Sequence, residues 1–476
     1  MAASFRRAAD LGRSPGSFVE QVLRALWLAA AAMTLVACGG GGSEQSGAGV
    51  APPTTVSPPT APPPQQPVSK GSVVIRAITT AGLPVGGVTV SLNGGFDGRS
   101  VTTDASGEAS FQDVPAGDAS TNLGGSGYYV VYRRLTVTEG SQTRVTVTLM
   151  RTTEAVPVLL ATYPAKPSAD GSRLTVEADV AILTSDGSSR ADLVAADFGL
   201  EGSCGWYQCV LEADGRDTYA DYAARATVAS FNTVSVPPGA SSAVGVLIEQ
   251  SGKMGTFDPQ GLRLQAVRDY FDRVLPPNLV TLASQRDTGA TPFLTTYGGF
   301  TSDGSQFRSA IDGLRGQEAG DSRTLGAIAE MADFMKANIA GMTGSPRLAM
   351  VVMGTDAAIH GDCPDQTTCQ RSLQAALDAV RTAGITVIAA GLSGAAEVAA
   401  STGGPSAWIQ DPGQWPVLFR ALDPLALGGL PYYRVSLELD AGTQGVFIKG
   451  RSVMGELTVR VGTDTRLFLW YLSIPI

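Results

Sequence analysis

The sequence predicts a multidomain chain of the α/β plus β class, in which a doubly wound α/β domain is flanked by β-sandwich modules. From residue 243 onward, apolar strand-like runs alternate with helical periods. This order builds a largely parallel sheet covered by helices. Short β-branched runs separated by Gly, Pro, Asn and Asp fill residues 72–151 and 172–236, and they return after residue 429. These runs predict antiparallel β structure on both sides of the α/β segment.

Residues 1–38 are expected to be a signal peptide. A basic start precedes residues 25–37 (ALWLAAAAMTLVA), a run shorter than the roughly 20 residues of a membrane-spanning helix. Its end, Leu-Val-Ala before Cys38, resembles a bacterial lipobox. The resemblance implies acylation of Cys38, as in palmitate-carrying lipoproteins, and anchoring without spanning. An ordinary signal peptide that happens to hold a cysteine is the alternative, and a start at Val22 would leave a more compact signal.

Residues 39–70 are expected to form a linker. The first part is rich in Gly and Ser, and residues 50–67 are rich in Pro. Such a composition predicts a flexible stretch followed by an extended, semi-rigid one. Gly39 follows the acylated cysteine, and the rule known for bacterial lipoproteins then implies the outer membrane, without saying on which face. The expected picture is a folded body held away from the membrane by a tether.

Charge and cysteine content limit the classes of partner. The net charge is -9, which argues against nucleic acid as a ligand. Besides Cys38, the four remaining cysteines fall into two close pairs, Cys204 with Cys209 and Cys363 with Cys369. In an exported chain these pairs predict two local disulfides. A metal site is the weaker alternative, because the chain has a single His and neither pair has CxxC spacing.

Residues 71–151 are expected to be a small β-sandwich. Residues 104–107 (DASG) form a turn signal before a strand that ends in residues 111–117 (FQDVPAG). This pattern resembles the carboxypeptidase-regulatory-like, or prealbumin-like, family. The resemblance implies a spacer or accessory binding module without catalytic residues.

Residues 155–240 and 429–476 are expected to pack together as β structure. Asp192-Leu193 and Asp197-Phe198 resemble the β segment that often precedes a von Willebrand factor type A (VWA) domain in bacterial surface proteins. We therefore expect the two segments to form a second sandwich beside the α/β domain.

Residues 241–428 resemble a VWA domain. Residues 246–254 (VLIEQSGKM) match the family's first strand and loop, residues 351–356 (VVMGTD) match its later strand ending in Asp, and residues 400–404 (ASTGG) match its Thr-Gly-Gly motif. The order and spacing of the three motifs follow the family. The resemblance implies a doubly wound sheet with a ligand site at its carboxyl edge.

In this family the same loops form a metal-ion-dependent adhesion site for Mg or Ca. The resemblance assigns Glu249, Ser251, Thr324 and Asp356 as ligands, and it places Lys253 where a second Ser is usual. An ammonium group has no acceptor and cannot ligate a cation. Two alternatives follow. Lys253 folds inward and pairs with Glu249 or Asp356 in place of the metal, which we favour, or it points to solvent and a weakened site survives.

The expected function is non-enzymatic binding of a protein or cell-envelope partner, which the α/β domain would recognise. A metal-dependent adhesin is the alternative. A hydrolase is disfavoured, because His360 has no Ser or Cys nucleophile motif beside it. We therefore predict no catalytic residues and no required cofactor.

Overall fold

The computed structural model describes residues 69–476 except 94–97, 126, 204–209, 212–216, 219–220, 288–291, 341–343, 355–365, 392–394, 441–445, 448–451, 463–464 and 476. Within the described strands and helices, the structure describes only the backbone of residues 201–225, 366, 452–456 and 465–475. The chain divides into two units, Met1–Pro67 and Val68–Ile476. The expected signal peptide and nearly all of the expected linker therefore lie outside the described residues.

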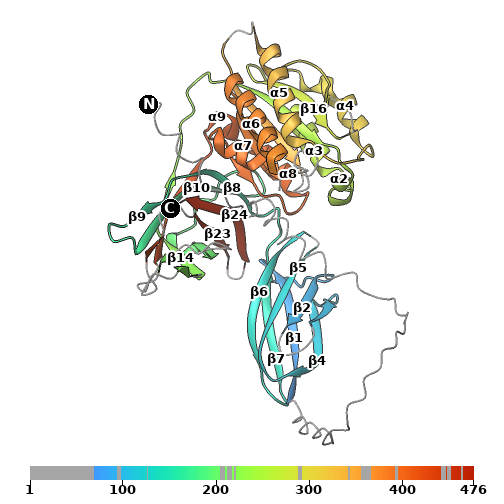
Figure 1. Ribbon diagram of the computed structural model, residues 1–476. Helices are drawn as coiled ribbons and strands as arrows, with labels where there is room; N and C mark the ends of the chain where they lie inside the picture. Colours follow the sequence, from blue (N-terminus) through green and yellow to red (C-terminus); the bar gives the residue numbers. More distant parts are fainter. Residues whose placement is uncertain are drawn as a thin grey trace, which may run out of the picture. The chain divides into compact units, whose positions relative to one another are not determined.

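The first folded part is a β-sandwich of two sheets, ordered β4-β1-β7 and β3-β2-β5-β6 (Figure 1). Alternate side chains of both sheets point into one core, which includes Ile75, Phe111 and Leu123. This alternation is the two-residue period of strands with one buried face. The strands are β1 (Lys70–Thr79), β2 (Thr89–Asn93), β3 (Arg99–Thr102), β4 (Glu108–Pro115), β5 (Gly117–Gly125), β6 (Tyr128–Val137) and β7 (Gln142–Leu149).

The second part begins with a mostly parallel set of strands in the order β17-β16-β15-β18-β19-β20. Within this set, β17 alone runs antiparallel to its neighbour. All eight residues of β15 are buried, as expected for a strand covered on both faces. The strands are β15 (Ser242–Glu249), β16 (Leu279–Gln285), β17 (Leu294–Thr296), β18 (Arg347–Gly354), β19 (Thr386–Gly391) and β20 (Ser406–Ala407).

Helices cover both faces of these strands (Figure 1). One core joins the sheet to α3, α4, α8 and α9, and the other joins it to α5, α6 and α7. Gly245 on β15 lets α5 approach closely, because a Cβ there would lie 2.6 Å from the sulfur of Met335. The helices are α2 (Gly252–Phe257), α3 (Leu262–Phe271), α4 (Arg308–Leu314), α5 (Thr324–Ile339), α6 (Gln366–Ala383), α7 (Ala395–Ser401), α8 (Gln414–Arg420) and α9 (Leu422–Leu427), with 3-10 turns η2 (Ala195–Asp197) and η3 (Gly304–Phe307).

The same sheet continues beyond β20 as antiparallel strands, in the order β8-β10-β21-β14-β11-β23-β24. The residues before and after the α/β segment therefore do pair, but they extend its sheet. Our prediction of a separate second sandwich is wrong on this point, because β20 pairs directly with β8. The strands are β8 (Val156–Thr162), β10 (Arg173–Leu183), β11 (Phe198–Ser203), β14 (Asp221–Asn232), β21 (Tyr432–Asp440), β23 (Ser452–Val461) and β24 (Thr465–Pro475).

This antiparallel part curls around its own core. Leu159 of β8, Val180 of β10, Leu437 of β21 and Val459 of β23 belong to one buried cluster. Strands so far apart in the sheet order can share a core only when the sheet bends back on itself. The short strand β9 (Lys166–Pro167) pairs with β10, and β12 (Val210–Leu211), β13 (Asp217–Thr218) and β22 (Val446–Phe447) form a small separate sheet.

Strands β8 and β10 contribute to two cores at once. On β10, Val180 and Ile182 face the antiparallel core, whereas Ala181 and Leu183 face the core beneath α8 and α9. On β8, Val158 faces the helices and Leu159 faces the other side. These two strands are thus the shared wall between the two parts of the sheet. Within the described part of the chain, no helix combines the length and hydropathy needed to cross a membrane.

Trp415 provides a test of the helix-covered core. Its ring is fully buried and meets Phe257 edge-on at 5.6 Å between centroids. Its Nε1–H donates to the Ala390 carbonyl at 3.3 Å. We expect Trp415→Ala to lower the free energy of unfolding in urea by about 3–5 kcal/mol, because a large cavity replaces the ring. Leu275→Ala, at a side chain 71% exposed, is the control and should change it by less than about 0.5 kcal/mol. Equal effects would contradict this view of the core.

Candidate functional site

The candidate site lies at the carboxyl end of β15, the central parallel strand. β16 pairs with one edge of β15 and β18 with the other, so the direction of winding reverses at this strand. Open α/β sheets bind their ligands beyond the strand ends at such a reversal. Glu249 is the last residue of β15 and Ser251 precedes α2, and both are buried. The topology therefore places two residues of the predicted site at the expected edge.

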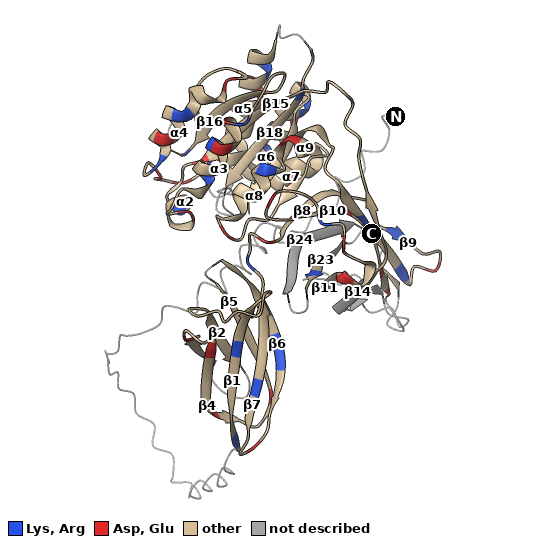
Figure 2. Cartoon of the chain, turned by 180° about the vertical axis from the view of Figure 1, so that it is seen from behind, with Lys and Arg blue, Asp and Glu red and all other residues tan. Residues whose placement is uncertain are grey.

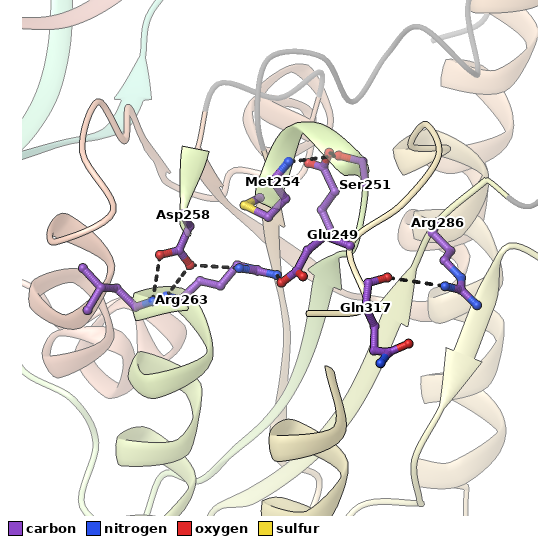
Figure 3. Close-up of polar contacts among 9 residues, drawn as sticks. Glu249, Ser251, Met254, Asp258, Arg263, Arg286 and Gln317 are labelled. Atoms are coloured by element: carbon purple, nitrogen blue, oxygen red, sulfur yellow. Dashed lines mark hydrogen bonds and ion pairs between the residues drawn. The ribbon is translucent and has the colours of Figure 1, made fainter. Parts of the chain in front are cut away.

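Glu249 and Ser251 are in direct contact (Figure 3). The Ser251 hydroxyl donates a hydrogen bond to the Glu249 carboxylate. Ser251 is also the N-cap of α2, because its Oγ accepts the backbone N–H of Met254 at 3.4 Å. A buried carboxylate is costly without such partners. The hydroxyl thus offsets part of the cost of burying the Glu249 carboxylate, and it also caps the N-terminus of α2.

Thr324 is the first residue of α5 and is also buried. Its Oγ1 accepts a hydrogen bond from the Gln285 amide at 3.3 Å. The amide oxygen of Gln285 accepts the backbone N–H of Arg323 at 3.0 Å. Gln285, at the end of β16, therefore fixes the start of α5 beside the end of β15.

The loop before α5 is held by backbone hydrogen bonds on two sides. Ala319 N–H donates to the Gln250 carbonyl at 3.0 Å, and Gly252 N–H donates to the Gly320 carbonyl at 2.9 Å. Asp287 N–H donates to the Asp321 carbonyl at 2.8 Å. Gly320 has a φ of +71°, and a Cβ there would lie 2.7 Å from the Asp287 carbonyl oxygen. The loop thus passes between the ends of β15 and β16, and only glycine fits at position 320.

Gln250 lies between Glu249 and Ser251 in the sequence. It is buried, with an exposed fraction of 2%. Neither the nitrogen nor the oxygen of its side-chain amide has a hydrogen-bond partner among the residues that the structure describes. A buried polar group without a partner costs about 1–3 kcal/mol. Gln250 is therefore a position where a bound group would lower the free energy.

A buried ion network supports the same loop (Figure 3). The Arg263 guanidinium lies 2.9 Å from Asp258 Oδ2 and 2.5 Å from Glu318 Oε1. The Asp258 carboxylate also accepts the backbone N–H groups of Leu262 and Arg263, at the start of α3. Burial raises the pKa of Glu318, but the hydrogen bond and charge of Arg263 outweigh it and hold that pKa below its ordinary value. The network thus ties α2, α3 and the loop together.

Lys253 does not lie where we expected it. The inward orientation that would let Lys253 pair with Glu249 is wrong, because Lys253 is exposed on the first turn of α2. The reason is local: the Ser251 cap starts the helix at Gly252, and the next position faces solvent. The other expected partner, Asp356, lies outside the described residues.

The described donors do not by themselves fit a Mg²⁺ cage. Mg²⁺ requires six oxygens in near-octahedral geometry. Glu249 supplies the single carboxylate among Glu249, Ser251 and Thr324, and both hydroxyls already make hydrogen bonds. In the described part of the chain, no group of three or more His, Cys, Asp or Glu converges. The assignment of Asp356 as a further ligand stays a prediction.

Several predicted residues cannot be placed. Cys369 lies in the first turns of α6 and carries no free thiol. Its expected partner lies outside the described residues, so the pairing stays a prediction. The expected residues outside the described part are Cys38, Cys204, Cys209, Asp356, His360 and Cys363.

The sequence motifs did not single out Gln250, Gln285 or the Arg263 network. Asp258 and Arg263 are near in sequence, but Asp258 lies three residues before the N-cap Gly261, so the capping pattern did not predict their contact. Nothing local linked Glu318 to them. Its contact with Arg263 spans 55 positions of sequence.

Comparisons with known proteins show only distant likenesses. No protein-family model matches the chain, and no curated protein matches it in sequence. Among solved structures, the pilus adhesin SpaC from Lactobacillus rhamnosus GG is 8% identical, with 66% of this chain and 48% of SpaC covered and a TM-score of 0.32. The VWA domain of SpRpn10 is 17% identical, with 34% of this chain and 82% of that domain covered and a TM-score of 0.25.

The minor pilin GBS52 from Streptococcus agalactiae is 18% identical over 18% of this chain, with a TM-score of 0.16. The chain spans about half the length of this pilin and of SpaC, at 45% and 48%. Similarities this weak carry no functional argument. What the structure itself defines is a mostly β chain of several sheets, one of which has a helix-covered parallel part.

The buried network gives a prediction with a matched control. Asp258→Asn should lower the free energy of unfolding by about 3 kcal/mol or more, because it leaves the fully buried Arg263 partly uncompensated. Asp312→Asn breaks the exposed pair with Arg268, at 2.7 Å, and should cost less than about 1 kcal/mol. Urea denaturation of both variants measures the difference. A small effect at Asp258 would show that the network does not hold the loop.

Proposed function

We propose that the chain is a membrane-anchored, non-enzymatic lipoprotein of the VWA class that binds a protein or cell-envelope partner at the carboxyl edge of β15. The strand order supports this class, because the parallel strands wind outward on both sides of β15 and end in the antiparallel β17. Two of the three sequence motifs of the resemblance lie at the ends of β15 and β18, and the third lies at the end of α7, before β20.

The observation that carries the proposal is the buried amide of Gln250, which has no hydrogen-bond partner among the described residues. It lies at the topological switch point, next to the Glu249–Ser251 pair. A stable protein tolerates such a cost where a function requires the group. We infer that a hydrogen-bonding group of the partner reaches this amide.

In this proposal the metal site is degenerate, and no metal is needed for binding. Glu249 is already compensated by the Ser251 hydroxyl. Thr324 accepts from Gln285, which leaves its oxygen only partly available. The exposed ammonium of Lys253 adds positive charge near the rim of the site and disfavours a second cation there.

One observation favours the alternative, a metal-dependent adhesin with a working Mg or Ca site. Because Lys253 is exposed on α2, it does not fill the space beside Glu249. A cation bridged to Glu249 and Asp356 through water would then be compatible with the described side chains. This alternative predicts metal-dependent stability, which the preferred proposal does not.

The tether belongs to the same proposal. Acylation of Cys38 would fix the chain to the outer membrane, and the linker would carry the folded body to a partner at a distance. The face of the membrane on which it would act is left open.

Gln250 tests the binding proposal. Gln250→Leu keeps the size of the side chain and removes an unsatisfied amide, so stability should stay equal or rise by about 1–3 kcal/mol. Partner capture should fall when the biotinylated full chain is cross-linked on intact bacterial envelopes and the captured bands are compared. Gln306→Leu, at an exposed glutamine, is the control and should capture as the unchanged chain does. A destabilised Gln250→Leu variant, or one that captures normally, would contradict the proposal.

A metal titration separates the two candidate functions. The melting temperature of the full chain should not rise in millimolar Mg²⁺ or Ca²⁺, because the described donors are already engaged. Saturation at 100 times Kd would add about 2.7 kcal/mol, which a thermal melt detects. A rise that Asp356→Ala abolishes would establish the adhesin alternative instead. Lys253→Ser restores a possible ligand, and a rise confined to that variant would show that Lys253 is what excludes the metal.

A further inference from the structure

The outward face of the sheet β3-β2-β5-β6 has a row of uncharged polar residues across its four strands. Cross-strand pairing places Ser100, Ser91, Asn122 and Tyr132 side by side, one from each strand. We call these four residues the polar row. Strands lie about 4.8 Å apart, so the row is about 14 Å long. It presents hydroxyl and amide groups in a line, with the Ser91 and Ser100 hydroxyls 2.8 Å apart.

The charged groups near the polar row are engaged with neutral ones. Asp118 accepts a hydrogen bond from Thr136 at 3.3 Å. Arg134 is exposed two residues along β6 from Tyr132, and hydrogen bonding from Ser120 and then from Arg134 lowers the pKa of Tyr132. The four residues of the row are themselves uncharged, and these ionised groups lie beside the row rather than in it.

The opposite sheet of the sandwich has a different surface. Basic residues occur on β1 and β7 and acidic residues on β4, as Figure 2 shows. Arg144 and Glu108 form an ion pair across this sheet at 3.6 Å. An ordinary solvated β face has such charges. Such charges are fewer around the polar row, where Arg134 and Asp118 lie beside it on the same face.

Tyr132 adds an apolar surface to the row. Its side chain is 54% exposed, and the neighbouring Val130 is 62% exposed. Because Tyr132 is an outward position of β6, part of its ring is open to solvent. Val130 leans over Gly124, where a Cβ would lie 2.7 Å from a Val130 methyl carbon. The ring and the valine form a low apolar platform beside the row.

We propose that this outward face, centred on Asn122 and Tyr132, binds an uncharged polysaccharide. Sugar rings offer many hydroxyls and no charge, which complements a row of hydroxyl and amide groups with little charge of its own. Their C–H faces suit an exposed tyrosine ring, which combines an apolar body with a polar end. The polar row has no ionised side chain of its own, and the net charge of -9 repels anionic polymers. This binding goes beyond the function proposed for the α/β site and does not depend on it.

The test is native gel electrophoresis of the full chain in gels that contain hydroxyethyl cellulose, xyloglucan or glycogen, with polygalacturonate as a charged comparison. At least one neutral polymer should retard the chain, and polygalacturonate should not. Tyr132→Ala and Asn122→Ala should each weaken the retardation at least tenfold, equivalent to about 1.4 kcal/mol. Arg144→Ala on the opposite sheet is the matched control and should be retarded as the unchanged chain is.

Other results would overturn the proposal. These are no retardation by any of the three neutral polymers, retardation that Tyr132→Ala leaves intact, or retardation by polygalacturonate alone. Sedimentation that shows a dimer dissolved by Tyr132→Ala would assign the face to a second copy of the chain instead. Tyr132→Phe keeps the ring, so it should keep most of the binding and show that Tyr132→Ala does not act by unfolding. Glu249→Gln should leave retardation unchanged, which separates this test from that of the α/β site.

Discussion

The fold depends on strands β8 and β10 being buried on both faces. Backbone hydrogen bonds between β20 and β8 join the parallel and antiparallel parts into one sheet. Alternate residues of β8 and β10 then serve a helix-covered core on one side and a curled β core on the other. Each apolar core needs this wall, so neither can be completed without the other. The stability of the candidate site follows from the same wall, because the site lies at the edge of that sheet.

Within the α/β part, the site is built by connections between strand ends rather than by the strands themselves. The Ser251 cap joins the end of β15 to the start of α2, whereas the Gln285 amide and the Arg263 network each join segments that are distant in sequence. Together they fix the loop around Gly320 while leaving the Gln250 amide unpaired among the described residues. The polar row on the sandwich differs in kind, since its geometry comes from strand register alone. The chain thus presents one buried, preorganised site and one open, flat surface.

Much of the α/β part could be predicted from sequence, because burial on both faces leaves a continuous apolar run. The apolar run that begins at residue 243 corresponds to β15 (Ser242–Glu249), and one of the helical periods after it corresponds to α5 (Thr324–Ile339). We missed β16, whose run LVTLASQ mixes polar residues into a strand buried through its pairing with β15. We also missed β5, whose glycines and small polar residues are typical of turns. The orientation of Lys253 could not be predicted, since it depends on where the Ser251 cap starts α2.

The α/β segment leaves the antiparallel sheet after Asn232 and returns at Tyr432, and these two residues face each other on β14 and β21. Chain ends that meet in this way allow an inserted domain to be gained or lost without disturbing its host. Here deletion of the α/β segment would remove the helices that bury Val158 on β8 and Leu183 on β10. The chain connectivity would therefore survive removal of the inserted segment, but the exposed apolar wall would make the remaining part prone to aggregate.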